Sequence, residues 1–162
     1  MTMKMENLDA FREAFEKVGE DMLTEELLTP KVYYDAKINI EEVNDKMLNI
    51  INKMAPFGPA NMTPVFYVNN LRDDGTGRII GKTAEHIRLN VKREKDSLAA
   101  VGFGMADKLV DIKKASSFEA CFQINENIFR GNRSIQLMLK DARPSRLEDL
   151  IALNALYRPG PM

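Results

Sequence analysis

An alternating segment at residues 86–92 constrains the fold of this chain more than any other feature. Ile87, Leu89 and Val91 alternate with polar residues, so a β-strand here would have one apolar and one polar face. We interpret the longer stretch, residues 78–92, as one long strand. Residues 78–95 contain six Lys or Arg and two Asp or Glu, in a chain of net charge −1. The basic face predicts either a surface that binds a polyanion or an ordinary solvated surface.

Composition limits the remaining possibilities. The chain has 162 residues, 44% of them hydrophobic and 29% charged, which is typical of one soluble globular domain with an appendage. No apolar run is as long as a membrane span, and no apolar signal-peptide core follows the first lysines. Cys121 is the only cysteine and His86 the only histidine, which excludes an internal disulfide and a His/Cys zinc cage. We therefore expect a cytoplasmic chain with no cofactor, no bound metal and no membrane partner.

Helical spacing of apolar residues predicts several helices. An amphipathic helix is expected over residues 8–22, capped by Asn7, and a short one over residues 24–28 ends before Pro30. The uncovered apolar face of the first helix predicts self-association or docking. Two further helices are expected, one over residues 43–54 and a small one that Asp107 would cap. The apolar stripes consist of Leu8, Phe11, Phe15, Val18 and Met22 in the first helix, and of Val43, Met47, Ile50, Ile51 and Met54 in the third.

Period-two patterns predict the strands. One strand is expected over residues 32–38, before the third helix. From residue 65 the order is strand, loop, long strand, strand, small helix, strand, basic loop and strand. Five strands with a helix between the third and fourth predict an α+β fold, an OB-fold-like five-stranded β-barrel with N-terminal helices and a C-terminal tail helix. Such barrels bind oligonucleotides on their second and third strands and in two loops. The two loops would here be residues 69–77 and 127–133.

The basic segments coincide with those binding elements, so single-stranded DNA is the expected partner. Arg78, Lys82, Arg88 and Lys92 are candidates for phosphate contacts, with a solvated face as the alternative. Phe129 either stacks on a base beside Arg130 and Arg133 or plugs the barrel. The other candidates for contact with DNA are Tyr67 by stacking, Asn127 by hydrogen bonds and His86 within the strand. Structural roles are the alternative for Asn127 and His86, and Cys121 is expected to be inert.

The order of several short motifs resembles the RecJ family of single-strand DNA exonucleases. The matching residues are Pro56-Phe57-Gly58 with Asn61 and Pro64, Gly81 with His86-Ile87-Arg88-Leu89, Gly102-Phe103-Gly104, Asn127 with Phe129 and Gly131, and Gln136-Leu137. The resemblance implies that residues 31–143 form the nucleic-acid-binding OB domain of that family with its linker helix. It also implies that residues 1–30 are a linker and the last helix of the DHHA1 catalytic-core domain.

RecJ-type nucleases degrade single strands from 5′ to 3′ in DNA repair and recombination. They use Mn or Mg held by aspartates and histidines, including an Asp-His-His run. This chain has one histidine, His86, which lies in the predicted barrel strand. We therefore expect a non-catalytic binding module whose partners are single-stranded DNA, the missing nuclease domains and single-strand-binding protein. A protein–protein adaptor is the alternative, because OB barrels also bind proteins.

The tail, residues 144–162, carries a second resemblance. Residues 146–162, ending in Tyr-Arg-Pro-Gly-Pro-Met, resemble part of the catalytic subunit of the bacterial replicative DNA polymerase, polymerase III alpha. Ser145 and Glu148 would form a capping box for a helix that ends at Pro159. We interpret the tail as a fragment joined to the OB domain rather than as a working polymerase element.

Overall fold

The computed structural model describes residues 2–145 and divides the chain into two compact units between Lys31 and Val32. The first unit contains a 3-10 turn, Met5–Asn7, and the helices α1 (Leu8–Met22) and α2 (Glu25–Leu28). Both helices confirm the prediction, but Asn7 makes no side-chain cap bond because it already belongs to the 3-10 turn. None of the residues of α1 is buried, and the rings of Phe11 and Phe15 stack at 5.8 Å along its apolar stripe.

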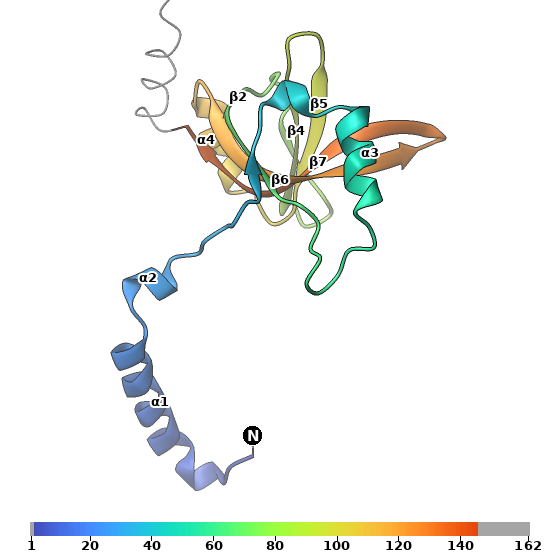
Figure 1. Ribbon diagram of the computed structural model, residues 1–162. Coiled ribbons are helices and arrows are strands. Elements are labelled where there is room, and N and C mark those ends of the chain that lie inside the picture. Colours follow the sequence, from blue (N-terminus) through green and yellow to red (C-terminus); the bar gives the residue numbers. More distant parts are fainter. Residues whose placement is uncertain (1, 146–162) are drawn as a thin grey trace, which may run out of the picture. The chain divides into compact units, whose positions relative to one another are not determined.

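The second unit is built on one seven-stranded sheet (Figure 1). Its helical elements are a 3-10 turn, Ile40–Glu42, α3 (Asp45–Lys53) near β6, and α4 (Lys108–Lys114) near β7. The strands are β1 (Ala36–Lys37), β2 (Phe66–Leu71), β3 (Arg78–Ile80), β4 (His86–Lys92), β5 (Ser97–Gly102), β6 (Phe118–Phe129) and β7 (Asn132–Pro144). Their order in the sheet is β1-β2-β6-β7-β5-β4-β3.

This architecture confirms the mixed α+β class, whereas the five-stranded barrel is not confirmed. The sheet has seven strands because β1 adds in parallel to β2, and because β3 is a strand of its own. Its ladder ends at β1 and β3. Beyond the ladder, the segment after β2 also bonds to β4: Lys92 N donates to Arg72 O at 2.8 Å, and Asp74 N donates to Asn90 O at 2.9 Å.

The alternating segment forms β4 as predicted, with its apolar residues in the core. Ile87, Leu89 and Val91 are at most 1% exposed, and Leu98 and Ala100 face Val91 and Leu89 from β5. The single long strand over residues 78–92 is wrong. A turn with left-handed backbone at Gly81 and Ala84 reverses the chain, so β3 and β4 form an antiparallel hairpin.

The predicted basic loop at residues 127–133 is also wrong. Strands β6 and β7 run through it as a long two-stranded ribbon, which extends from the body of the sheet in Figure 1. Phe129 pairs with Asn132, so only Arg130 and Gly131 make the turn. Both have positive φ, 49° and 81°, as a two-residue turn that follows the twist of its strands requires.

Other predicted boundaries change more modestly. The strand over residues 32–38 shortens to Ala36–Lys37, and the loop from residue 69 begins only after Leu71 because β2 is longer. Asp107 makes no cap bond, since its own backbone is already helical. In α3 the core-facing residues are Leu48 and Ile51, while Ile50 and Met54 are exposed, so the predicted stripe was partly out of phase.

Two further sequence-based expectations concern the tail helix and membrane spans. The tail helix and its capping residue Glu148 lie outside the described residues. Within the described part of the chain, no helix is long and apolar enough to cross a membrane.

Candidate nucleic-acid interface

Arg78 and Arg88 are direct partners on β3 and β4 and form the centre of the candidate interface. Both side chains are exposed, and neither forms an ion pair with a described residue. Like charges directly opposite each other on an antiparallel pair are destabilising. An anion bound across the two guanidinium groups would relieve that repulsion, and guanidinium groups fit phosphate oxygens well.

The register extends this face across four strands. Asn90 pairs with Ala99, Ala99 with Gln136, and Gln136 with Asn125. One row of the outer face therefore consists of three amide side chains and the small side chain of Ala99. The next row continues from Arg88 through Val101 to Met138. Sequence reasoning missed Gln136, Asn125 and Met138 because their position depends on the parallel pairing of β5 with β7. The only local signal for Gln136 and Met138 was their alternation with Ile135, Leu137 and Leu139.

The remaining basic candidates of this segment take different positions. Lys82 is exposed in the turn between β3 and β4, and Lys92 is exposed at the end of β4. His86 is partly buried, and its Nδ1 accepts a hydrogen bond from Gly104 N at 3.1 Å. The His86 ring also meets the Phe103 ring edge-on at 5.0 Å. These contacts give His86 a structural role in joining β4 to the turn after β5.

The tip of the β6–β7 ribbon carries the aromatic candidate. Phe129 is 63% exposed, which rules against its plugging the barrel, and the Arg130 guanidinium lies 5.2 Å from its ring centroid. Arg133 is already paired with carboxylates. Glu126 accepts a hydrogen bond from its Nε, and Asp45 Oδ1 lies 3.8 Å from its Nη1. Asn127 pairs with Ser134 in the ribbon and is partly buried. A phosphate at Arg133 would have to compete with two carboxylates.

Tyr67 is occupied by internal contacts. Its hydroxyl donates to Glu119 Oε2 at 2.7 Å, its ring stacks on Tyr34 at 5.1 Å, and Lys37 lies 5.7 Å above the same ring. Glu119 is 2% exposed and also accepts a hydrogen bond from Arg143 Nε. That hydrogen bond to Glu119 raises the pKa of Arg143. The network ties β2, β6 and β7 together, and it accounts for Tyr67 without a nucleic acid.

Nucleophile and metal chemistry have little support in the described structure. Burial raises the pKa of the Cys121 thiol, and the carboxylates of Asp141 and Glu119 add to the shift. A thiol with a raised pKa is a poor nucleophile near neutral pH. Among residues 2–145, no group of three or more His, Cys, Asp or Glu side chains is arranged to hold a metal ion.

Comparison with known proteins identifies this unit. The family model of the RecJ OB domain matches residues 34–141, which is most of the chain. The chain belongs to the RecJ OB domain family. The match confirms the resemblance inferred from the motifs between Pro56 and Leu137. It covers all seven strands except the last three residues of β7.

Relatives that match over most of the chain are RecJ proteins. The single-stranded-DNA-specific exonuclease RecJ of Bacillus subtilis is 27% identical over 90% of this chain, and that of Haemophilus influenzae is 24% identical over 89%. This chain spans only 18% and 25% of those two proteins. The crystal structure of RecJ with Mn²⁺ from Thermus thermophilus has the same fold, with a TM-score of 0.69 at 15% identity, over 90% of this chain and 20% of that one.

The C-terminal segment matches a different protein. It is 71% identical over 31 residues to DNA polymerase III subunit alpha of Treponema pallidum, which is 19% of this chain and 3% of the polymerase subunit. This match confirms the resemblance of the tail to DNA polymerase III alpha. Only 17 residues follow Ser145, so the matched segment begins upstream of Arg146.

Proposed function

We propose that this chain is a single-stranded DNA-binding module of a RecJ-like 5′–3′ exonuclease that acts in DNA repair and recombination in the cytoplasm. The observation that carries the proposal is the cross-strand pair of Arg78 and Arg88, two exposed guanidinium groups with no described acidic partner. Family membership and the exonuclease activity named for the RecJ relatives support it. The partners would then be DNA, the nuclease domains of RecJ and single-strand-binding protein.

The binding surface we propose has two parts. Arg78, Arg88, Lys82 and Lys92 would hold phosphates on the β3–β4 hairpin, while the amides of Asn90 and Gln136 lie in the adjoining row. Phe129 with Arg130 at the ribbon tip would stack on a base, since base–aromatic stacking holds single strands with little sequence preference. Four other candidates would contribute less: Tyr67, His86, Asn127 and Arg133. The side chains of Tyr67, His86 and Arg133 already make hydrogen bonds within the protein, and Asn127 pairs with Ser134 in the β6–β7 ribbon.

We further propose that the sheet works as an OB barrel closed between β2 and β4. The support is the pair of backbone bonds from the Arg72–Asp74 segment to β4 and the bridge between Asp73 and Val91. Closure at this point would leave the outer faces of β4 and β5 accessible to DNA. These two strands correspond to the ones that bind oligonucleotides in OB folds.

We propose that the chain binds DNA without cleaving it, because the matching family model is the OB domain alone. The purified chain should leave an end-labelled single strand intact in Mn²⁺ or Mg²⁺. Metal-dependent shortening of that strand would contradict the proposal.

The binding proposal is tested by anisotropy titrations of a fluorescent oligonucleotide at several salt concentrations. Arg78→Ala and Arg88→Ala each remove one charge that would bind a phosphate, so each should lower the log–log salt slope by about 0.7. Arg133→Ala is the matched control: it removes the same charge, but from a guanidinium already paired with Glu126. An unchanged slope for both variants on β3 and β4 would contradict the proposal.

An adaptor function remains the second candidate because of one observation. Ile128 and Phe129 at the ribbon tip are 68% and 63% exposed, an apolar pair of the kind that protein interfaces use. Salt-insensitive capture of a protein through the ribbon, without DNA binding by the β3–β4 face, would favour this alternative.

A further inference from the structure

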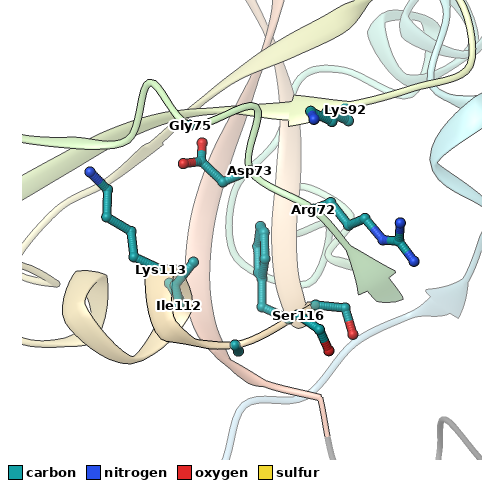
Figure 2. Close-up of a pocket in the computed structure, with 10 residues that line it drawn as sticks. Arg72, Asp73, Gly75, Lys92, Ile112, Lys113 and Ser116 are labelled. Carbon is teal, nitrogen blue, oxygen red and sulfur yellow. The ribbon is translucent and has the colours of Figure 1, made fainter.

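A cavity of about 400 Å³ lies between the loop after β2, the end of β4 and the segment joining α4 to β6. We call it the basic cavity, because Arg72, Lys92 and Lys113 line it with Asp73 as the single carboxylate. Figure 2 shows these side chains together with Gly75 and Ser116 around the cavity. We propose that the basic cavity binds one phosphate group.

The three cations form no direct ion pair with a described residue, although Lys92 has a charge interaction with the nearby carboxylate of Asp74. Arg72, Lys92 and Lys113 are all exposed. They come from three separate segments of the chain, so only the tertiary structure brings them to one cavity. Charged hydrogen bonds from guanidinium and ammonium groups to phosphate oxygens are among the strongest in proteins. A phosphate is therefore the kind of ligand that suits a cavity lined by these cations.

The acidic groups beside the cavity are held by their own loop. Asp73 Oδ2 accepts a hydrogen bond from Gly77 N at 3.2 Å, and Asp74 Oδ1 accepts one from Thr76 N at 2.9 Å. Asp73 Oδ1 is buried and has no hydrogen-bond partner among the described residues. A protonated phosphate oxygen or a sugar hydroxyl can supply the missing donor. The carboxylate then favours a nucleotide over a fully ionised inorganic anion.

A buried hydroxyl also lines the cavity. Ser117 is 4% exposed, and its Oγ finds no hydrogen-bond partner in the described structure. Buried polar atoms are normally paired, so an unpaired one calls for a missing group. Rotation about the Cα–Cβ bond of Ser117 offers its hydroxyl to an oxygen held in the cavity.

Gly77 lies next to two of the residues that line the cavity, Asp73 and Lys113. A Cβ atom at this buried position would lie 2.9 Å from Asp73 Oδ2 and 3.3 Å from both Lys113 Cε and Leu109 Cδ1. Glycine therefore lets the loop close against α4. That approach brings the side chains of Asp73 and Lys113 to the same side of the cavity.

The phosphate has two chemical sources, a free nucleotide or the backbone of a bound strand. Lys92 belongs both to the cavity and to the polar face of β4, so a strand on that face could place one phosphate in the cavity. The strand source rests on the proposed DNA binding, whereas the nucleotide source does not.

The test follows backbone amide shifts by NMR while inorganic phosphate, dTMP or an unphosphorylated oligothymidine is added at constant ionic strength. Saturable shifts at Gly75, Ser116 and Ser117 are expected with phosphate and dTMP if the source is a nucleotide. If the source is a strand, the same amides shift only with the oligonucleotide. No saturable shift at these amides with any of the three would overturn the proposal.

Lys113→Ala should weaken binding about tenfold, as expected when one charged hydrogen bond is removed. Lys114→Ala is the matched control, because it removes the next lysine of α4, which does not line the cavity. Equal weakening in the two variants would overturn the proposal, since it would show a general charge effect. Arg88 lies outside the cavity, so Arg88→Ala separates the two proposals. It should weaken binding of the oligonucleotide, and if the source is a nucleotide it should leave binding of dTMP unchanged.

Discussion

Tyr67→Phe removes one hydroxyl from the network that joins β2 to β6 and leaves the aromatic ring in place. Glu119, which accepts that hydroxyl's hydrogen bond at 2.7 Å, is 2% exposed, so its Oε2 would lose a donor that water cannot readily replace. A hydrogen bond to a charged group contributes about 1.5–3 kcal/mol. For a domain of this size roughly 4 °C of melting temperature corresponds to 1 kcal/mol, so a decrease of roughly 6–12 °C is expected.

The assay is a melting curve of Tyr67→Phe beside Tyr34→Phe. Tyr34 contributes the other ring of the stack at 5.1 Å, and its hydroxyl makes no hydrogen bond with a described residue. The control should therefore melt close to the parent chain. Affinity for single-stranded DNA should be unchanged in both variants below their melting temperatures. A stable Tyr67→Phe variant that binds DNA more weakly would refute this account and return Tyr67 to the interface.

Three further predictions concern the core, the ribbon turn and the partly buried thiol of Cys121. Leu89→Ala should cost about 2–5 kcal/mol in urea unfolding, because Leu89 is 1% exposed in the core, and a cost below 1 kcal/mol would place it outside the core. Gly131→Val should cost about 1–2 kcal/mol, since φ is 81°, and Gly131→Asn less; equal costs would argue against a left-handed turn. The pKa of Cys121 is raised in the fold, so its contribution to stability is present below the unfolded pKa and is lost as pH rises through the folded pKa. Cys121→Ser should flatten that alkaline loss in urea titrations, and an unchanged profile would contradict the assignment.

Local patterns predicted the elements whose signal lies within a few residues. The alternation of Ile87, Leu89 and Val91 was enough to predict β4, and helical spacing was enough for α1. The hairpin turns were missed because polar and basic residues dominate both of them. In the segment after Ile80 and at Arg130-Gly131, positive φ reverses the chain, and a single glycine signals this only weakly.

The candidate site was only partly predictable for a similar reason. Arg88 and Lys92 could be placed on the polar face of β4 from their spacing alone. Whether a side chain is available for DNA depends on its neighbours in the folded sheet, such as Glu126 and Asp45 at Arg133 or Glu119 at Tyr67. The basic cavity could not be predicted from the sequence because its three cations come from the loop after β2, from β4 and from α4, which meet only in the tertiary structure.

DNA binding by the β3–β4 hairpin is tested most directly by a map of the surface that single-stranded DNA contacts. Amide and arginine side-chain signals of the labelled chain would be followed by NMR during titration with an oligothymidine. Binding through the β3–β4 hairpin predicts the largest shifts at Arg78, Arg88 and Lys92, with a second group at Phe129 and Arg130. Shifts confined to α3, or none at saturating oligonucleotide, would contradict it.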